Sequence, residues 1–295
     1  MKAFSWIRIC AMLMAILTMV TMTVACDGEN EPKDTDPGVT TEEPATEEPA
    51  TEAPTEKETE TEAPKPLKLK IASYNIQNGA GAGHDMTKLA KNITNKNIDI
   101  VGLQEVDQNV NRSNRIDTMK LLSEATGYKY YAFFKAIETG GGEYGVGILS
   151  KYPILSTEKV MLESGTHEQR VLGRAEIDVD GLIVNFFVTH LSYESATIRK
   201  TQYQQINNEV LKYDNFILTG DFNTGNFSEY SAIANSGMVN NADFKVTTFP
   251  GSNSSIDNIV FSSETWKFGI PYTVTASHSD HYMLYSMGTY IGERP

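Results

Sequence analysis

The amino-acid sequence predicts an α/β domain in which two mixed β-sheets pack together with helices on the outside. Two observations support this prediction. Runs of β-branched and aromatic residues alternate with stretches of helical periodicity over residues 67–295. Some neighbouring runs have a helix between them, whereas 175–179 and 182–189 are joined by the hairpin turn Asp180-Gly181. A purely parallel, doubly wound sheet would not contain both kinds of connection.

Eight runs have the composition of strands and three have the periodicity of helices. The expected strands are at 69–74, 98–103, 146–150, 175–179, 182–189, 216–219, 256–261 and 282–287. The expected helices are at 86–95, 116–126 and 198–211. Gly127 and Gly237 occupy positions where helices are expected to end.

Charge and cysteine content limit the function. The chain has 295 residues and a net charge of −13, but residues 1–66 contain 14 acidic and 5 basic residues, so most of the charge lies there. The remaining body has a charge of only −4, which argues against nucleic-acid binding through bulk positive charge. Cys10 and Cys26 are the only cysteines, so the body has no disulfide framework, cysteine–zinc site or cysteine nucleophile.

Residues 1–26 have the features of an export signal. Two basic residues flank the start, and the run 9–26 is uncharged and mostly apolar. The run ends in Thr23-Val24-Ala25-Cys26, which resembles a bacterial lipobox, although that pattern prefers Leu at the position of Thr23. We therefore predict lipidation of Cys26 and anchoring on the outer face of the bacterial cytoplasmic membrane or the cell surface. An uncleaved anchor and plain secretion are the alternatives, and all three place the body outside the cytoplasm.

Residues 27–66 are predicted to be a disordered linker. They repeat Thr, Glu, Pro and Ala, as in 42–46 and 47–51, and contain almost no large apolar residue. Such a segment cannot bury enough apolar surface to offset its ordering entropy. Residues 67–295 then form one catalytic domain.

Polar side chains collect around six of the predicted strands: they follow four of the runs, lie within 256–261 and directly precede 282–287. They are Asn75, Gln104, Glu105, His190, Asp221, Asn223, Asp257, Asp280 and His281. Each residue alone has an ordinary structural explanation, such as a turn for Asn75 or a helix cap for Asp221. Their recurrence next to or within six runs indicates one site, because α/β proteins form sites at the carboxyl ends of strands.

The residue types in this set predict the chemistry. Carboxylate and amide oxygens without cysteine suit Mg²⁺ or Mn²⁺. A histidine beside carboxylates can act as an acid or base near neutral pH. The sequence has no Gly-rich phosphate loop with a lysine, which argues against nucleotide-driven transfer. Metal-assisted hydrolysis of a phosphate ester is the chemistry that remains.

Seven motifs in order carry a family resemblance over about residues 67–291. They are Ala72-Ser73-Tyr74-Asn75-Ile76, Leu103-Gln104-Glu105-Val106-Asp107, the segment 144–153, Thr189-His190-Leu191, Thr219-Gly220-Asp221-Phe222-Asn223, Ser255-Ile256-Asp257-Asn258-Ile259 and Ser279-Asp280-His281. Together they resemble the endonuclease/exonuclease/phosphatase superfamily of deoxyribonuclease-I-like phosphohydrolases. The resemblance implies a four-layer α/β sandwich of two mixed sheets flanked by helices.

The resemblance also implies roles for the metal ligands. Glu105 is similar to the principal Mg²⁺ ligand, and Asn75 helps to hold the metal or the phosphate. Asp280 is similar to the family aspartate that makes a second metal contact. Mn²⁺ would share these ligands.

The catalytic roles implied by the resemblance involve both histidines. His281 is a general base or a phosphate-binding group oriented by Asp257, and His190 contacts the phosphate or the leaving group. Asp221 and Asn223 position the attacking water and stabilise the crowded phosphorus centre. The choice between His281 and Asp221 as the general base stays open at this stage.

Three residues are candidates for contacts with the substrate phosphate. Arg170 and Arg174 lie in the stretch where relatives carry a phosphate-contacting arginine, and Arg170 is favoured. Tyr144, beside Glu143, stands where relatives place a group near the leaving oxygen. Val146 replaces the asparagine of the family's Tyr-Gly-Asn pattern.

Three hypotheses for the substrate follow. The first is a phosphodiesterase acting on nucleic acid, for which the loop 112–115 could contact backbone phosphates or be an exposed polar turn. The second is a phosphatase or phosphodiesterase of lipid head groups or small phosphate esters, which membrane tethering favours, although no long apolar hairpin for lipid entry is seen. The third is a catalytically silent surface-binding module, against which the intact motif set argues. A monomer without a protein partner is expected in each case.

Overall fold

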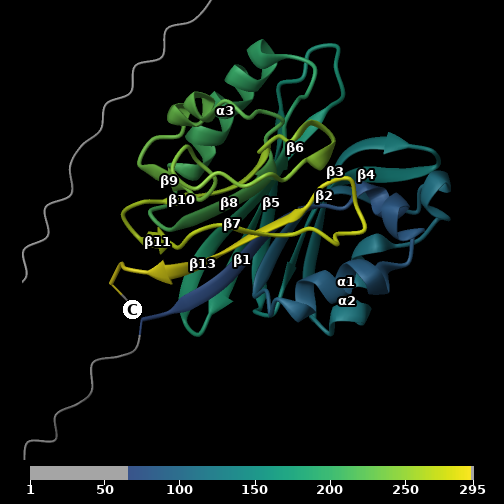
Figure 1. Ribbon diagram of the computed structural model, residues 1–295, viewed down its shortest axis with the longest axis horizontal. Helices are drawn as coiled ribbons and strands as arrows, with labels where there is room; N and C mark the ends of the chain where they lie inside the picture. The colour runs from purple at the N-terminus through teal and green to yellow at the C-terminus, as the bar shows by residue number, and fades with distance from the viewer. Residues whose placement is uncertain (1–65, 294–295) are drawn as a thin grey trace, which may run out of the picture. The chain divides into compact units, whose positions relative to one another are not determined.

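In the computed structural model, which describes residues 66–293, two β-sheets pack face to face and helices cover their outer faces (Figure 1). This arrangement confirms the predicted fold class. Cys26, the predicted export signal and nearly all of the predicted linker lie outside the described residues.

The first sheet contains seven strands in the order β11-β13-β1-β2-β4-β3, with β12 paired to β13. Only β1 and β2 are parallel, and the other pairs are antiparallel. The strands are β1 (Lys68–Asn75), β2 (Ile100–Gln108), β3 (Tyr130–Thr139), β4 (Gly142–Ser150), β11 (Trp266–Phe268), β12 (Tyr272–Val274) and β13 (Met283–Tyr290).

The second sheet contains six strands in the order β5-β6-β7-β8-β10-β9. Here β7 and β8 are parallel, and the other pairs are antiparallel, including the predicted hairpin in which Val179 pairs with Leu182. Both sheets are therefore mixed. The strands are β5 (Ile154–Leu162), β6 (Arg170–Val179), β7 (Leu182–His190), β8 (Phe216–Asp221), β9 (Ser236–Met238) and β10 (Asp257–Ser262).

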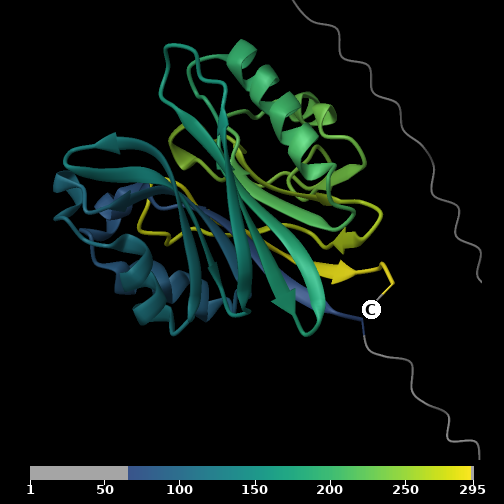
Figure 2. The same cartoon turned by 180° about the vertical axis from the view of Figure 1, so that it is seen from behind.

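Three α-helices form the outer layers (Figure 2). Helices α1 (Met86–Asn95) and α2 (Thr118–Thr126) cover the first sheet, and α3 (Ala196–Val210) covers the second. Each begins at a side chain that caps a free backbone N–H: Asp85, Asp117 and Ser195 respectively. No helix within 66–293 is long and apolar enough to cross a membrane.

The two glycines predicted to end helices behave differently. Gly127 adopts a left-handed conformation at the end of α2, as predicted. The prediction for Gly237 was wrong, because this residue lies within β9. A side chain there would meet the Phe261 ring at 2.6 Å, so close packing against that ring is what requires glycine.

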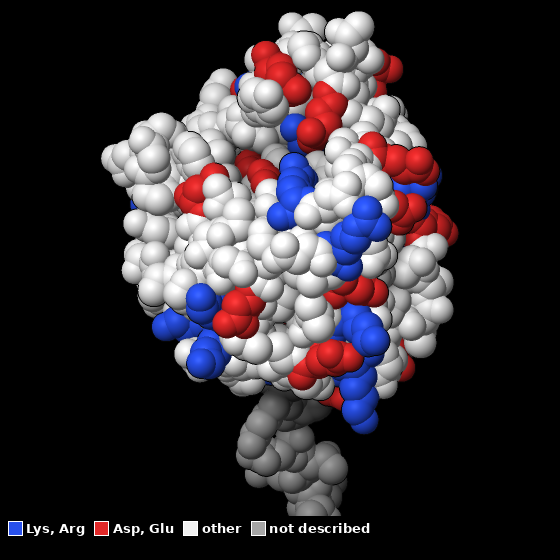
Figure 3. All heavy atoms as spheres, turned by 90° about the vertical axis from the view of Figure 1, so that its right-hand side faces the viewer, with Lys and Arg blue, Asp and Glu red and all other residues white. Residues whose placement is uncertain are grey.

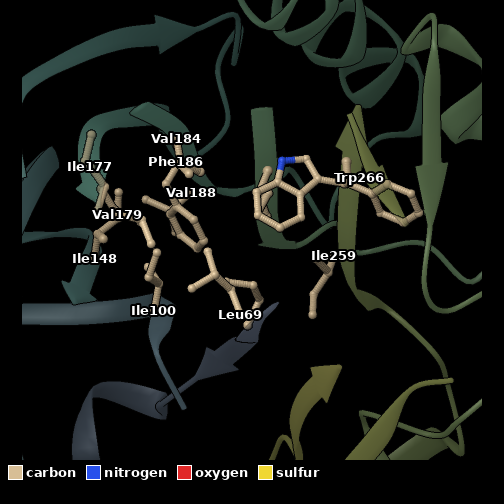
Figure 4. Packing of buried hydrophobic residues seen from close by; sticks show 14 of the residues in the cluster. Leu69, Ile100, Ile148, Ile177, Val179, Val184, Phe186, Val188, Ile259 and Trp266 are labelled. Carbon is tan, nitrogen blue, oxygen red and sulfur yellow. The ribbon is translucent and has the colours of Figure 1, made fainter. Parts of the chain in front are cut away.

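Four short 3₁₀ segments complete the connections: η1 (Gln77–Ala82), η2 (Asn111–Ser113), η3 (Phe227–Ala232) and η4 (Pro250–Ser252). The main core lies between the sheets, where strands from both contribute β-branched, leucine and aromatic side chains (Figure 4). Burial of each such side chain contributes about 1.5–3 kcal/mol. This packing fixes the ends of the central strands, from which the site is built.

Candidate active site

The predicted polar residues of the central strands meet at one edge of the sandwich. Asn75 at the end of β1 lies beside Gln104 of β2 in the first sheet. In the second sheet, Asp221 at the end of β8 pairs with His190 of β7 on one side and with Asp257 of β10 on the other. Strand register alone therefore gathers these side chains, as the sequence predicts.

The side chain of Asn75 joins the two sheets. Its amide nitrogen donates to Asp221 Oδ2 at 3.0 Å and to Glu105 Oε1 at 3.2 Å. Its amide oxygen accepts from the backbone N–H of Gln77 at 3.0 Å, which fixes the orientation of the amide. A fully buried asparagine thus holds two carboxylates from different sheets close together.

Glu105 is presented by a β-bulge and not by the end of a strand. Strand β2 continues to Gln108, and its pairing with β4 shifts register between Leu103 and Val106. Glu105 has a φ of 57°, which costs a non-glycine residue about 1–2 kcal/mol. Burial raises the pKa of Glu105, the hydrogen bond from Asn75 opposes this shift, and the charge of Asp280 adds to it.

Asp257 and His281 form a buried pair. Asp257 Oδ2 lies 2.9 Å from His281 Nδ1, and the imidazole donates because a carboxylate only accepts. The Thr248 hydroxyl accepts from the backbone N–H of Asp257, and the Phe249 ring packs beside the imidazole. Burial by itself lowers the pKa of His281, but the nearby carboxylates outweigh burial and raise it to about 10.

Asp221 stands at the centre of the cluster. Its Oδ1 accepts from the backbone N–H of Asn223, while Oδ2 lies 3.5 Å from His190 Nε2 and 3.6 Å from His281 Nε2. Burial and the charge of Asp257 raise the pKa of Asp221 to about 7. Burial, with the charges of Arg170 and His281, lowers the pKa of His190 well below its usual value, which favours a neutral imidazole.

Arg170 and Tyr144 extend the site on the His190 side. Both line a small cavity with His190, and the Arg170 side chain is 4% exposed. Arg170 Nη1 pairs with Glu168 at 3.0 Å, but within the described part of the chain its buried Nε has no hydrogen-bond partner. Burial, with the charge of Glu105, raises the pKa of Tyr144 well above its usual value.

Two further candidates lie at the rim of the cluster. Asp280 is exposed and accepts from the Ser279 hydroxyl at 3.3 Å. Asn223 has a positive φ of 52°, and its side-chain amide donates to the Leu191 carbonyl, which ties together the loops after β7 and β8. Asn223 therefore fixes the geometry of these loops through its side chain and binds Asp221 through its backbone N–H.

The structure does not bring Arg174 to the site. Its Nη1 donates to Asn185 Oδ1 at 2.7 Å, its Nη2 pairs with Glu158 at 3.0 Å, and its guanidinium lies over the Tyr213 ring. It stands four residues along β6 from Arg170, about 13 Å for an extended strand. We therefore withdraw Arg174 as a phosphate contact and keep Arg170.

One contributor to the site, and one ion pair that lies outside the cluster, were not assigned from the sequence. Thr248, which supports Asp257, lies in an irregular loop without a strand or helix pattern that would reveal it. Asp107 is the last residue of the motif 103–107. Its partner Arg112 lies across a turn, so their contact depends on the path of the loop.

The donor set fits a divalent cation. Glu105 and Asp280 supply carboxylate oxygens, whereas the amide oxygen of Asn75 already accepts from the Gln77 N–H. The ligand atoms of Asp221, Asp257 and His281 all lie within 4.8 Å of one another. Burial raises the pKa of Glu105, and Asp257 Oδ1 is buried without a hydrogen-bond partner among residues 66–293. Both observations indicate negative charge that the surrounding residues compensate only in part. A hard cation with oxygen ligands would compensate it.

The fold is that of the deoxyribonuclease-I-like phosphoesterase class. The family described as "Endonuclease/Exonuclease/phosphatase family" matches the chain over residues 72–281. The chain belongs to this family, and the resemblance seen in the motifs is confirmed.

Solved structures share the fold at low sequence identity. An endonuclease/exonuclease/phosphatase from Beutenbergia cavernae is 20% identical, with a TM-score of 0.63 over 77% of this chain and 74% of its own. The mannosyl-6-phosphatase of Bacteroides thetaiotaomicron is 17% identical, with a TM-score of 0.57 over 74% and 98%. The D. rerio TDP2 complex with a single-strand DNA product is 18% identical, with a TM-score of 0.60 over 75% and 98%. None of the curated proteins compared matches the chain.

Proposed function

We propose that this protein is a metal-dependent phosphodiesterase that hydrolyses a P–O bond by attack of water. The observation that supports this most strongly is the bridge made by Asn75, which holds Glu105 and Asp221 together beside two buried histidines. The protein would use Mg²⁺, with Mn²⁺ as an alternative. A nucleic-acid backbone is the first candidate among diester substrates.

Glu105 and Asp280 would hold the cation, while Asn75, whose amide nitrogen faces Glu105, would support it by holding that carboxylate in place. When bound, the ion would polarise a phosphoryl oxygen and neutralise developing charge, a contribution of several kcal/mol. Asn75 has the further task of fixing Glu105 relative to Asp221, so that both sheets contribute to one reaction centre.

Asp221 and the two histidines would act on water and phosphate. Asp257 accepts a hydrogen bond from the Nδ1–H of His281, so the Nε2 atom of that ring is turned towards Asp221. Asp221 Oδ2, between the Nε2 atoms of both histidines, is placed to orient the attacking water and take its proton. His281 and His190 then contact phosphoryl oxygens, where preorganised donors stabilise charge as it develops.

A second candidate is the hydrolysis of small phosphate monoesters or lipid head groups. The buried Arg170, with an Nε atom that no described group satisfies, could neutralise the additional charge of a monoester. The face in Figure 3 also carries interspersed acidic and basic residues and no continuous basic patch of the kind that favours nucleic acid.

Hydrolysis of three phosphates by the purified chain tests the proposal: bis(p-nitrophenyl) phosphate, p-nitrophenyl phosphate and supercoiled plasmid. We expect cleavage of the diester that requires Mg²⁺ or Mn²⁺, is abolished by EDTA and falls about 10²–10³-fold in His281→Ala. His167→Ala, which removes an exposed histidine, is the matched control and should behave as wild type.

The pattern across these substrates separates the candidates. Nicking of the plasmid would support a nuclease, whereas faster cleavage of the monoester would support the second candidate. A folded protein that cleaves none of the three with either metal would contradict the proposed function.

A further inference from the structure

A buried aspartate fixes an exposed arginine beside the candidate site. Asp107, near the end of β2, is fully buried, yet both its oxygens bind the guanidinium of Arg112. Arg112 Nε donates to Oδ2 at 2.9 Å and Nη2 donates to Oδ1 at 2.8 Å. The Arg112 side chain is nevertheless 50% exposed. One part of this guanidinium is thus held in the protein while the rest faces solvent.

Tyr144 places this guanidinium next to the site. Tyr144 pairs directly with Asp107 across β2 and β4, and Arg112 lies 5.2 Å from the centre of its ring. The same tyrosine lines the small cavity with Arg170 and His190. Tyr144 therefore contacts Arg112 and also lines the cavity that Arg170 lines.

The loop that carries Arg112 is also held in place. The backbone N–H of Asn111 donates to Gly140 O at 2.9 Å, in the turn between β3 and β4. The backbone N–H of Asn109 donates to Ile116 O at 2.8 Å, which closes the base of the loop. Arg112 is consequently held by its side chain and by its loop before any ligand binds.

The ion pair with Asp107 uses only part of the hydrogen-bonding capacity of the Arg112 guanidinium. The Nε–Nη2 edge is used by Asp107, but across residues 66–293 Nη1 donates to no group. A guanidinium has five N–H groups in a planar fork that matches phosphate oxygens. Because Asp107 and Tyr144 already restrict its rotation, binding an anion through the free edge would cost little side-chain entropy.

We propose that Arg112 binds a second phosphate of the substrate, beyond the phosphate that is cleaved. This inference rests on the proposed function and deepens it, because it makes the substrate a phosphate ester that carries two phosphates. Such a group occurs in an oligonucleotide backbone and in small bisphosphorylated metabolites, and the recognition chemistry is the same for both. Asp107 and Tyr144 act as positioning residues for Arg112.

Two matched pairs of substrates test the inference and separate these sources. The nucleotide pair is thymidine 5′-(p-nitrophenyl phosphate) with and without a 3′-phosphate. The sugar pair is fructose 1,6-bisphosphate and fructose 6-phosphate. We expect the wild-type chain to have the higher kcat/KM for the doubly phosphorylated member of one pair.

Arg112→Met should lower that kcat/KM about 10- to 100-fold, as expected for the loss of charge-assisted hydrogen bonds. The loss should be in KM, with kcat for the singly phosphorylated member unchanged. Because this variant leaves Asp107 buried without its partner, Asp107→Asn/Arg112→Met should be measured beside it. Lys120→Met is the matched control, since it removes an exposed cation of α2 whose ion pair within residues 66–293 is with Glu124.

The outcomes distinguish failure of the inference about Arg112 from failure of the proposed function. Hydrolysis of the singly phosphorylated members with no advantage for a second phosphate would refute the inference alone. Equal losses on both members of a pair in the double variant would also refute it, because they indicate a purely structural role. No hydrolysis of any of the four compounds would contradict the proposed function, and the inference with it.

Discussion

At the scale of single residues, the site concentrates charge that its surroundings compensate only in part. Asp221, Asp257 and Glu105 are buried or nearly so, and Arg170 and His281 are the cations closest to them. Burial of a carboxylate normally raises its pKa and disfavours its charged form. The site is thus arranged to gain stability when it binds a cation or a group that donates hydrogen bonds.

The Asp257–His281 pair makes a prediction for the metal-free protein. The pKa of His281 is raised from 6.5 to about 10 in the folded state. The pair therefore stabilises the fold fully below pH 6.5, and this contribution declines as the pH rises through about 10. Since one pKa unit corresponds to about 1.4 kcal/mol, the change is measurable by urea unfolding.

We expect the stability advantage of the wild-type chain over Asp257→Asn, both in EDTA, to be largest near pH 6 and to shrink towards pH 10. The histidine resonances followed by NMR over the same range provide the control, because His281 should titrate at lower pH in the variant. An advantage that grows with pH would show that the pair does not hold a protonated histidine.

At the scale of secondary-structure elements, central strands were predictable and edge strands were not. Strands β1, β7 and β8 are mostly buried, and each contains a run of apolar residues that predicts a strand. Strand β5 lies at a sheet edge with most of its residues exposed, so it lacks the apolar pattern of a buried strand. Strand β3 is also at an edge and was not predicted, although its first residues, 130–134, are aromatic or apolar. Strands β9, β11 and β12 have three residues each, too few for a periodic pattern.

The residues of the site also divide into those that the sequence predicted and those that it did not. Residues at the ends of central strands were predicted because strand register brings them together without help from loops. Arg170 was favoured over Arg174, but Arg174 could not be excluded from the sequence, because residues four apart share one face of a regular strand and differ only in their distance along it. The bulge at Glu105 and the pairing of Asp107 with Arg112 depend on local backbone geometry that no sequence period reports.

At the scale of the whole molecule, the charge separates into two parts. Residues 1–66 contribute −9 and the remaining chain −4. Under the proposed function, the body would therefore attract phosphate through local groups and a bound cation and not through its overall field. We propose that the acidic first part, which carries the predicted lipidation site Cys26, tethers the enzyme outside the cell.

Lipidation at Cys26 makes this tethering testable. In a bacterial host, the wild-type chain should fractionate with membranes and incorporate radiolabelled palmitate, because the lipid would be attached through Cys26. Cys26→Ser should lose the label, and Cys10→Ser should keep it as the matched control. Membrane association without any label would instead favour an uncleaved helical anchor, and release of an unlabelled chain would favour plain secretion.

The most direct test of the central claim is the metal-dependent rate of phosphodiester hydrolysis by Glu105→Gln. This change keeps the size of the side chain and its place beside Asn75 but removes the charge that would hold the cation. We predict a loss of about 10²–10³-fold in kcat at saturating Mg²⁺ with the fold unchanged. A variant that keeps more than half of the wild-type rate would contradict the assignment of this cluster as the reaction centre.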